Sequence, residues 1–107
     1  MPDWRQQEGQ ACETILTLWL LRRGFYVCRP LAAHGPVDVV AYDDHGRLYL
    51  LDAKKEHRRL SKNRKTATRI HRPLKLNQRL LGVRVAYVDM ESGDCHIVPP
   101  LECLPDA

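Results

Sequence analysis

The stretch GPVDVVAYDDHGRLYLLDAKK, residues 35–55, decides the fold that we expect for this chain. Its two hydrophobic segments, Val37 to Asp43 and Arg47 to Ala53, flank a polar turn, which predicts two antiparallel strands joined as a hairpin. Carboxylates and an ammonium group stand at the far end of this hairpin, where a purely structural sheet has no need of them. The stretch therefore predicts both a core element and a chemical site.

The length of the turn determines which of these charged side chains share a face. A four-residue turn puts Asp38 and Asp52 on opposite faces of the sheet. A three-residue loop that ends at Gly46, with the glycine in the left-handed conformation, places Asp38 directly opposite Asp52. Lys54 then lies on the same face, because side chains alternate along a strand.

Two opposed carboxylates repel each other and destabilise a sheet. A divalent cation reverses this effect, since Mg²⁺ prefers carboxylate oxygens and keeps some of its own waters. A neighbouring lysine can then orient or activate a metal-bound water for attack on a phosphate. The alternative is a solvent-facing hairpin end that carries an Asp–Lys ion pair. A third acid is expected from the first helix, where spacing alone does not separate Glu8 from Glu13.

The remaining sequence predicts one α/β domain over residues 1–107. Residues 4–23 carry apolar side chains at helical spacing and stop before Gly24, which is typical of an amphipathic helix. The other expected elements are a strand over 25–29, the two hairpin strands, a helix over 73–82, and strands over 83–90 and 95–98. The predicted order is therefore α-β-β-β-α-β-β.

The excess of positive charge is confined to one segment. Residues 54–79 hold 11 basic side chains and 1 acidic one, whereas the rest of the chain is acidic overall. Such a segment favours a polyanion as partner, because each neutralised phosphate releases counterions. Residues 55–72 are polar and show no clear period, which predicts a basic, mobile loop. Its side chains expected to contact phosphates are Lys55, Arg58, Arg59, Lys62, Arg64, Lys65, Arg69 and Arg72.

Two features indicate where the protein works. The first ten residues lack the charged-then-apolar pattern of a signal peptide, and no apolar run approaches the roughly 20 residues of a membrane span. We therefore expect an intracellular, cytoplasmic protein without a membrane partner. The segment IVPPLECLP, residues 97–105, can either form a subunit interface or close the core of the monomer.

Several of these residues match a known family. Asp38 after Val37, followed on the next strand by Asp52-Ala53-Lys54, resembles the PD-(D/E)xK motif of the restriction-endonuclease-like nucleases. GQACETILTLWLLRRGFYVCRP resembles the opening of the archaeal-type Holliday junction resolvases, with a glycine, a helix that bears a glutamate, then Gly-Phe, a strand and an arginine. The resemblance covers residues 9–54.

The resemblance implies a restriction-endonuclease-like core, with a central mixed β-sheet of about five strands flanked by helices. It assigns the catalytic roles to Glu13, Asp38, Asp52 and Lys54. It places a metal ion on Asp38, Asp52 and the backbone carbonyl of Ala53, with Glu13 bound directly or through water. Arg29 is expected near DNA, and His34 is expected to take a phosphate-binding or proton-transfer role.

The implied activity is that of a Mg²⁺-dependent endonuclease, with Mn²⁺ as substitute, which resolves four-way DNA junctions by paired phosphodiester hydrolysis. A homodimer and branched double-stranded DNA are the implied partners, and no small-molecule cofactor is expected. Thr14 stands where the resolvases usually have arginine, and Asp52 where they usually have glutamate. Two alternatives therefore stay open: another DNA nuclease of the PD-(D/E)xK type (a nickase, restriction or repair enzyme), or a non-catalytic nucleic-acid-binding protein.

Overall fold

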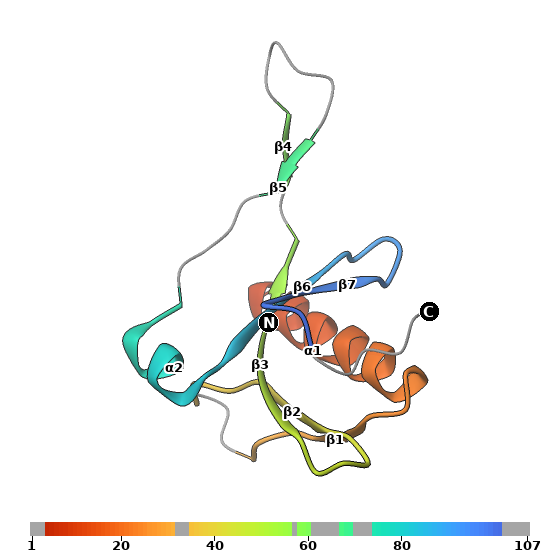
Figure 1. Cartoon of the computed structure of the whole chain (residues 1–107). Helices are drawn as coiled ribbons and strands as arrows, with labels where there is room; N and C mark the ends of the chain where they lie inside the picture. The colour runs from red at the N-terminus through yellow and green to blue at the C-terminus, as the bar shows by residue number, and fades with distance from the viewer. Residues whose placement is uncertain (1–3, 32–34, 57, 61–66, 70–73, 102–107) are drawn as a thin grey trace.

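The structure is a computed structural model that describes residues 4–31, 35–56, 58–60, 67–69 and 74–101. Its body is one mixed sheet of five strands in the order β1-β2-β3-β6-β7 (Figure 1). The strands are β1 Tyr26–Cys28, β2 Val39–Tyr42, β3 Leu48–Lys55, β6 Arg84–Val88 and β7 Cys95–Val98. Strands β3 and β6 run parallel, and the other neighbours in this sheet run antiparallel. The predicted α/β fold class, element order and mixed sheet are confirmed.

The first helix, α1 Trp4–Arg22, covers one face of this sheet (Figure 1). Its buried residues Cys12, Leu16, Trp19 and Leu20 recur at helical spacing, as the sequence predicts. The chain turns at Gly24, whose φ of 86° lies in the left-handed region that favours glycine. Asp3, the expected helix cap, lies outside the described residues.

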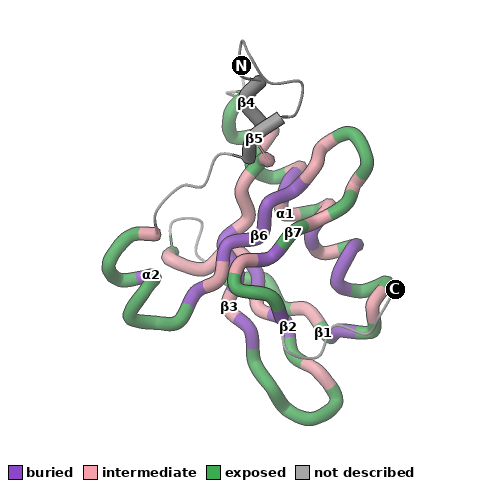
Figure 2. Tube along the Cα trace, turned by 45° about the horizontal axis from the view of Figure 1, so that its top comes forward, coloured by how far each residue is buried: buried purple, intermediate pink, exposed green. Residues whose placement is uncertain are grey.

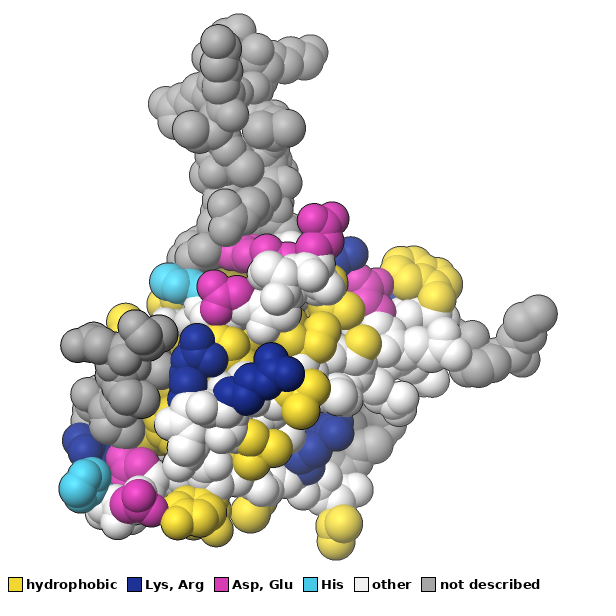
Figure 3. All heavy atoms as spheres, turned by 90° about the vertical axis from the view of Figure 1, so that its right-hand side faces the viewer, with side chains coloured by type: hydrophobic (Ala, Val, Ile, Leu, Met, Phe, Trp, Pro, Cys, Tyr) yellow, Lys and Arg dark blue, Asp and Glu magenta, His cyan; other side chains and the backbone are white. Residues whose placement is uncertain are grey.

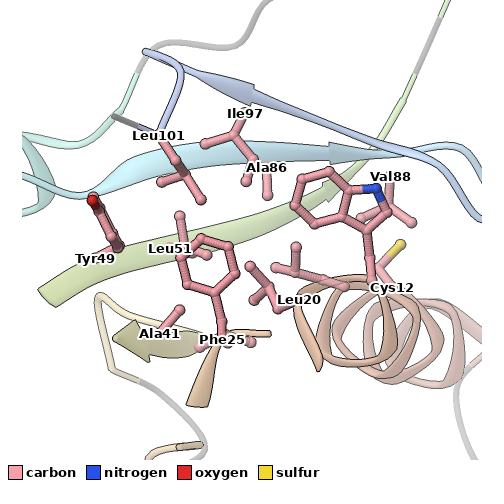
Figure 4. Close-up of a cluster of buried hydrophobic side chains, with 13 residues drawn as sticks. Cys12, Leu20, Phe25, Ala41, Tyr49, Leu51, Ala86, Val88, Ile97 and Leu101 are labelled. Atoms are coloured by element: carbon pink, nitrogen blue, oxygen red, sulfur yellow. The ribbon is translucent and has the colours of Figure 1, made fainter. Parts of the chain in front are cut away.

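The hydrophobic core lies between α1 and the sheet (Figure 4). Figure 2 shows the buried positions concentrated in α1 and in the central strands β3 and β6. Leu16, Leu20, Val39, Leu51 and Val88 are its largest fully buried side chains. This core holds the strand that carries Asp52 and Lys54 rigidly in place.

The hairpin of β2 and β3 takes the three-residue loop. Val40 pairs with Leu50. The N–H of Asp43 donates to the carbonyl of Arg47 at 3.2 Å, which closes the loop. Gly46 has a φ of 79°, the left-handed conformation that this loop needs. The register that brings the two aspartates opposite each other is therefore confirmed.

The basic segment differs from the expected loop. A two-stranded antiparallel sheet forms there from β4 Arg58–Leu60 and β5 Ala67–Arg69, and it projects beyond the end of β3 as an arm (Figure 1). The sequence shows no alternation of apolar and polar residues there, because an arm that stands away from the core has no face to bury. Residues 57, 61–66 and 70–73, which include Lys62, Arg64, Lys65 and Arg72, lie outside the description.

The C-terminal half completes the sheet. Helix α2 Leu76–Leu81 is shorter than expected and ends at Gly82, whose φ is 74°. Ile97 and Leu101 are buried in the core, so the described part of the C-terminal segment closes the core of the monomer. Among the described residues, no helix is long and apolar enough to cross a membrane.

Candidate active site

Asp38 and Asp52 meet where β2 begins and β3 approaches its end. The N–H of Asp38 donates to the carbonyl of Leu51 at 2.9 Å, which extends the ladder one residue before β2. The carboxylate of Asp38 then reaches across the hairpin, where its Oδ2 accepts a hydrogen bond of 2.9 Å from the N–H of Ala53. A strand position and a backbone donor therefore fix the Asp38 side chain beside Asp52.

Asp52 is a buried carboxylate, only 7% exposed. The Nζ of Lys54 lies 3.0 Å from its Oδ2, so the two residues form an ion pair along one face of β3. That same Oδ2 is buried and accepts no hydrogen bond from the described residues. The Lys54 ammonium compensates the charge of this oxygen, but no donor among the described residues is aligned to hydrogen-bond it, so it can accept a further cation.

The close approach of the two carboxyl groups changes the charge of the site. The pKa of Asp38 is raised from 3.8 to about 7, mainly because the group is buried and also because it shares a hydrogen bond with Asp52. The N–H of Ala53 opposes this rise, and the charge of Glu13 adds to it. Near neutral pH the Asp38 carboxyl group is therefore partly protonated, and a bound cation would displace this proton.

The structure separates the two helix glutamates that spacing leaves equivalent. Glu13 lies close enough to raise the pKa of Asp38, and its Oε2 pairs with the Nη2 of Arg29 at 2.5 Å. Glu8 instead pairs through Oε1 with the Nζ of Lys55 at 2.7 Å. Glu13 and Arg29 thus flank the two aspartates. Lys55, expected to contact phosphates, is engaged by α1.

The donor set fits a hard divalent cation. Mg²⁺ is commonly bound by one or two carboxylates together with waters and substrate phosphates. Asp38 and Asp52 supply carboxylate oxygens at one point, and the buried Oδ2 of Asp52 still lacks a hydrogen bond. In the described part of the chain no three His, Cys, Asp or Glu side chains gather closely enough to surround a metal, so water and phosphate would complete the shell.

Most of the other predicted DNA contacts belong to the arm or to segments beyond the description. Arg58, Arg59 and Arg69 lie on β4 and β5, where the backbone alone is described. His34 lies in residues 32–34, which are not described. The face shown in Figure 3 carries both acidic and basic side chains. On the face shown in Figure 3, acidic side chains gather along the upper edge while basic ones lie across the middle, so this face offers no continuous basic surface.

A pocket that the sequence pattern did not indicate lies beside this site. It has a volume of about 490 Å³ and lies between the start of α1 and the end of β3, with Trp4, Glu8 and Lys54 among its lining residues. The signal was present: Trp4, Glu8 and Cys12 follow one another at a spacing of four, so they share one face of the helix. Which strand this face meets depends on the tertiary structure.

Comparison with known proteins supports the fold. No family model and no curated protein sequence matches the chain. The solved structure of a bacterial homing endonuclease, I-Ssp6803I, is similar with a TM-score of 0.59 and 19% sequence identity, over 86% of this chain and 66% of that one. The likeness at this identity concerns the fold. The chain therefore has a nuclease-like α/β fold, and it spans less than two thirds of the length of that endonuclease.

Proposed function

We propose that this protein is a metal-dependent DNA endonuclease of the PD-(D/E)xK type that cleaves four-way junctions. The observation that carries the proposal is the convergence of Asp38, Asp52 and Lys54 at one end of the hairpin, with a buried Asp52 oxygen that accepts no hydrogen bond. The nuclease-like fold and the arm that carries basic residues beside this site support it.

The side chains have distinct roles in this reaction. Asp38 and Asp52 would hold Mg²⁺ or Mn²⁺ together with the Ala53 carbonyl, and the metal would supply a Lewis acid for the phosphate and an acidified water. Lys54, held by Asp52, donates hydrogen bonds from Nζ to the attacking water and to a phosphate oxygen. Asp38 would be deprotonated in the metal-bound site, because the attraction of each carboxylate to a divalent cation outweighs the repulsion between the two carboxylates.

The junction as substrate rests on the resemblance of residues 9–54 to the resolvases. Resolution requires two cuts on two strands, and a two-fold symmetric homodimer supplies two identical sites for them. A nuclease of linear duplex DNA is the second candidate, and the fold shared with a homing endonuclease favours it.

One assay separates these candidates. A labelled four-way junction and a linear duplex built from the same arms are incubated with Mg²⁺ or with chelator. Paired, Mg²⁺-dependent nicks in the junction alone support the resolvase. Cutting of both substrates retains the nuclease and removes the junction preference. Binding without cutting of either leaves the non-catalytic nucleic-acid-binding protein.

The carboxylates are tested by a matched pair of variants. Asp52→Asn is expected to abolish cleavage while DNA binding stays intact or tightens, because the variant repels phosphates less. Asp44→Asn makes the same charge change at the exposed turn of the same hairpin and is expected to leave cleavage unchanged. Loss of DNA binding in Asp52→Asn would instead indicate a structural role for the aspartate.

A further inference from the structure

The pocket beside the candidate active site lies at the end of β3 that carries Lys54. Its volume of about 490 Å³ is within the range of roughly 300–1,000 Å³ that is common for small-molecule sites. Ala53 and Lys54 line it as well as the candidate active site. Neither aspartate lines the pocket, so a group bound there would approach the candidate active site through Lys54.

The outer wall of the pocket is an exposed aromatic ring. Trp4 is 64% exposed although it is a large apolar side chain, and the guanidinium carbon of Arg5 lies 5.5 Å from the centroid of its ring. Tryptophan beside arginine is the combination on which nucleic-acid-binding proteins stack bases, since every base offers a flat π-face.

The polar lining suits a nucleotide, because it offers groups for a base and for the phosphates beside it. Glu8 lines the pocket, and its carboxylate, held by Lys55 at 2.7 Å, can accept a hydrogen bond from the amino group of a base. Arg5 and Lys54 also line the pocket and can face the flanking phosphates. The pocket thus combines an aromatic ring for stacking, a carboxylate that can accept a hydrogen bond, and a residue shared with the candidate active site. This combination suits a nucleobase.

We propose that this pocket binds an unstacked nucleobase of the substrate strand next to the cleaved phosphate, with Trp4 as its stacking platform. The inference rests on the proposed endonuclease function and extends it to the choice of substrate. A base within a continuous duplex is stacked on both sides, and extracting it costs a few kcal/mol. At branch points and in single strands, unstacking a base costs less free energy, so the pocket favours such DNA over intact duplex.

The test is a metal-free titration that involves no catalysis. The protein is titrated in chelator with a short oligodeoxycytidylate, and tryptophan fluorescence is followed. The protein has two tryptophans, and Trp19 is buried in the core, so a stacked base should quench the emission of Trp4. Trp4→Ala is expected to weaken binding about tenfold or more, and Trp4→Phe to retain most of the affinity while losing the quenching.

Gly9 offers a variant that fills the pocket without disturbing the fold. It lines the pocket, and a Cβ added there meets no atom within 4 Å. Gly9→Leu and Gly9→Ala should both stabilise α1, because both residues form helix better than glycine. The leucine alone is large enough to occupy the pocket, so Gly9→Leu is expected to weaken oligonucleotide binding at least several-fold relative to Gly9→Ala.

Two results would overturn the inference: unchanged affinity in Trp4→Ala, or equal affinity of the leucine and alanine variants at Gly9. Leu18→Ala serves as control, because Leu18 is also an exposed apolar residue of α1 and does not line the pocket. Failure of the proposed function is distinguishable, since it appears as absent cleavage with Mg²⁺ while the metal-free titration still reports on the pocket.

Discussion

The guanidinium of Arg29 lies 2.5 Å from the carboxylate of Glu13, which ties the segment after β1 to helix α1 beside the two aspartates. The resemblance assigns Glu13 to the metal and Arg29 to the DNA. In the structure, these two side chains form an ion pair with each other. Under the proposed function, a phosphate that draws Arg29 away would free the Glu13 carboxylate for the metal, which would link the binding of DNA to that of the cation.

Arg29→Ala is expected to lower DNA affinity and the cleavage rate about tenfold or more, because the variant loses the hydrogen bond that Arg29 would donate to a charged DNA phosphate. The free energy of unfolding should change by less than about 1 kcal/mol, since the ion pair is partly exposed. Cleavage rates and urea unfolding measure the two effects. Arg47→Ala is the matched control, because Arg47 has the same side-chain exposure of 44% and pairs with Asp43 at the far end of the hairpin.

The protonation of Asp38 makes stability depend on pH. Its pKa is raised to about 7 in the folded protein, so the folded state binds this proton more tightly than the unfolded state does. The stabilising contribution is complete below pH ~4 and is lost as the pH rises through ~7. In metal-free buffer, Asp38→Asn should therefore gain stability relative to the natural protein between about pH 5 and 8, as urea midpoints measure. Asp44→Asn should show no such trend, and a trend in both variants would contradict the assignment to Asp38.

The sequence predicts the structure correctly where that structure depends on residues close together in the chain. The register of the hairpin follows from a turn length and from Gly46, and its prediction from three residues was correct. The roles of Glu8 and Glu13 did not follow, because they depend on how α1 is rotated against β3. The arm was missed because β4 and β5 place Arg58 opposite Arg69, a like-charge pair that no propensity favours.

Leu51 tests how much the core stabilises β3, the strand that carries Asp52 and Lys54. It is fully buried in β3, whereas Leu48 on the same strand is 63% exposed. Leu51→Ala is expected to lower the free energy of unfolding by about 2–5 kcal/mol, because it removes buried apolar contacts and leaves a cavity. Leu48→Ala should change it by less than about 0.5 kcal/mol. Denaturant unfolding of both variants measures the difference, and equal losses would show that the sheet face at Leu48 is covered in solution.

The basic segment predicts how DNA binding responds to salt. Each phosphate contact contributes about 0.9 to the slope of log affinity against log salt concentration. Replacing Arg58, Arg59 and Lys62 by serine should therefore weaken binding and reduce this slope by roughly 2 to 3. Removing two basic residues of the body, Arg22 and Arg79, should leave the slope nearly unchanged. If the arm variant kept the slope of the natural protein, the arm would not contact the DNA backbone, and its charge would need another partner.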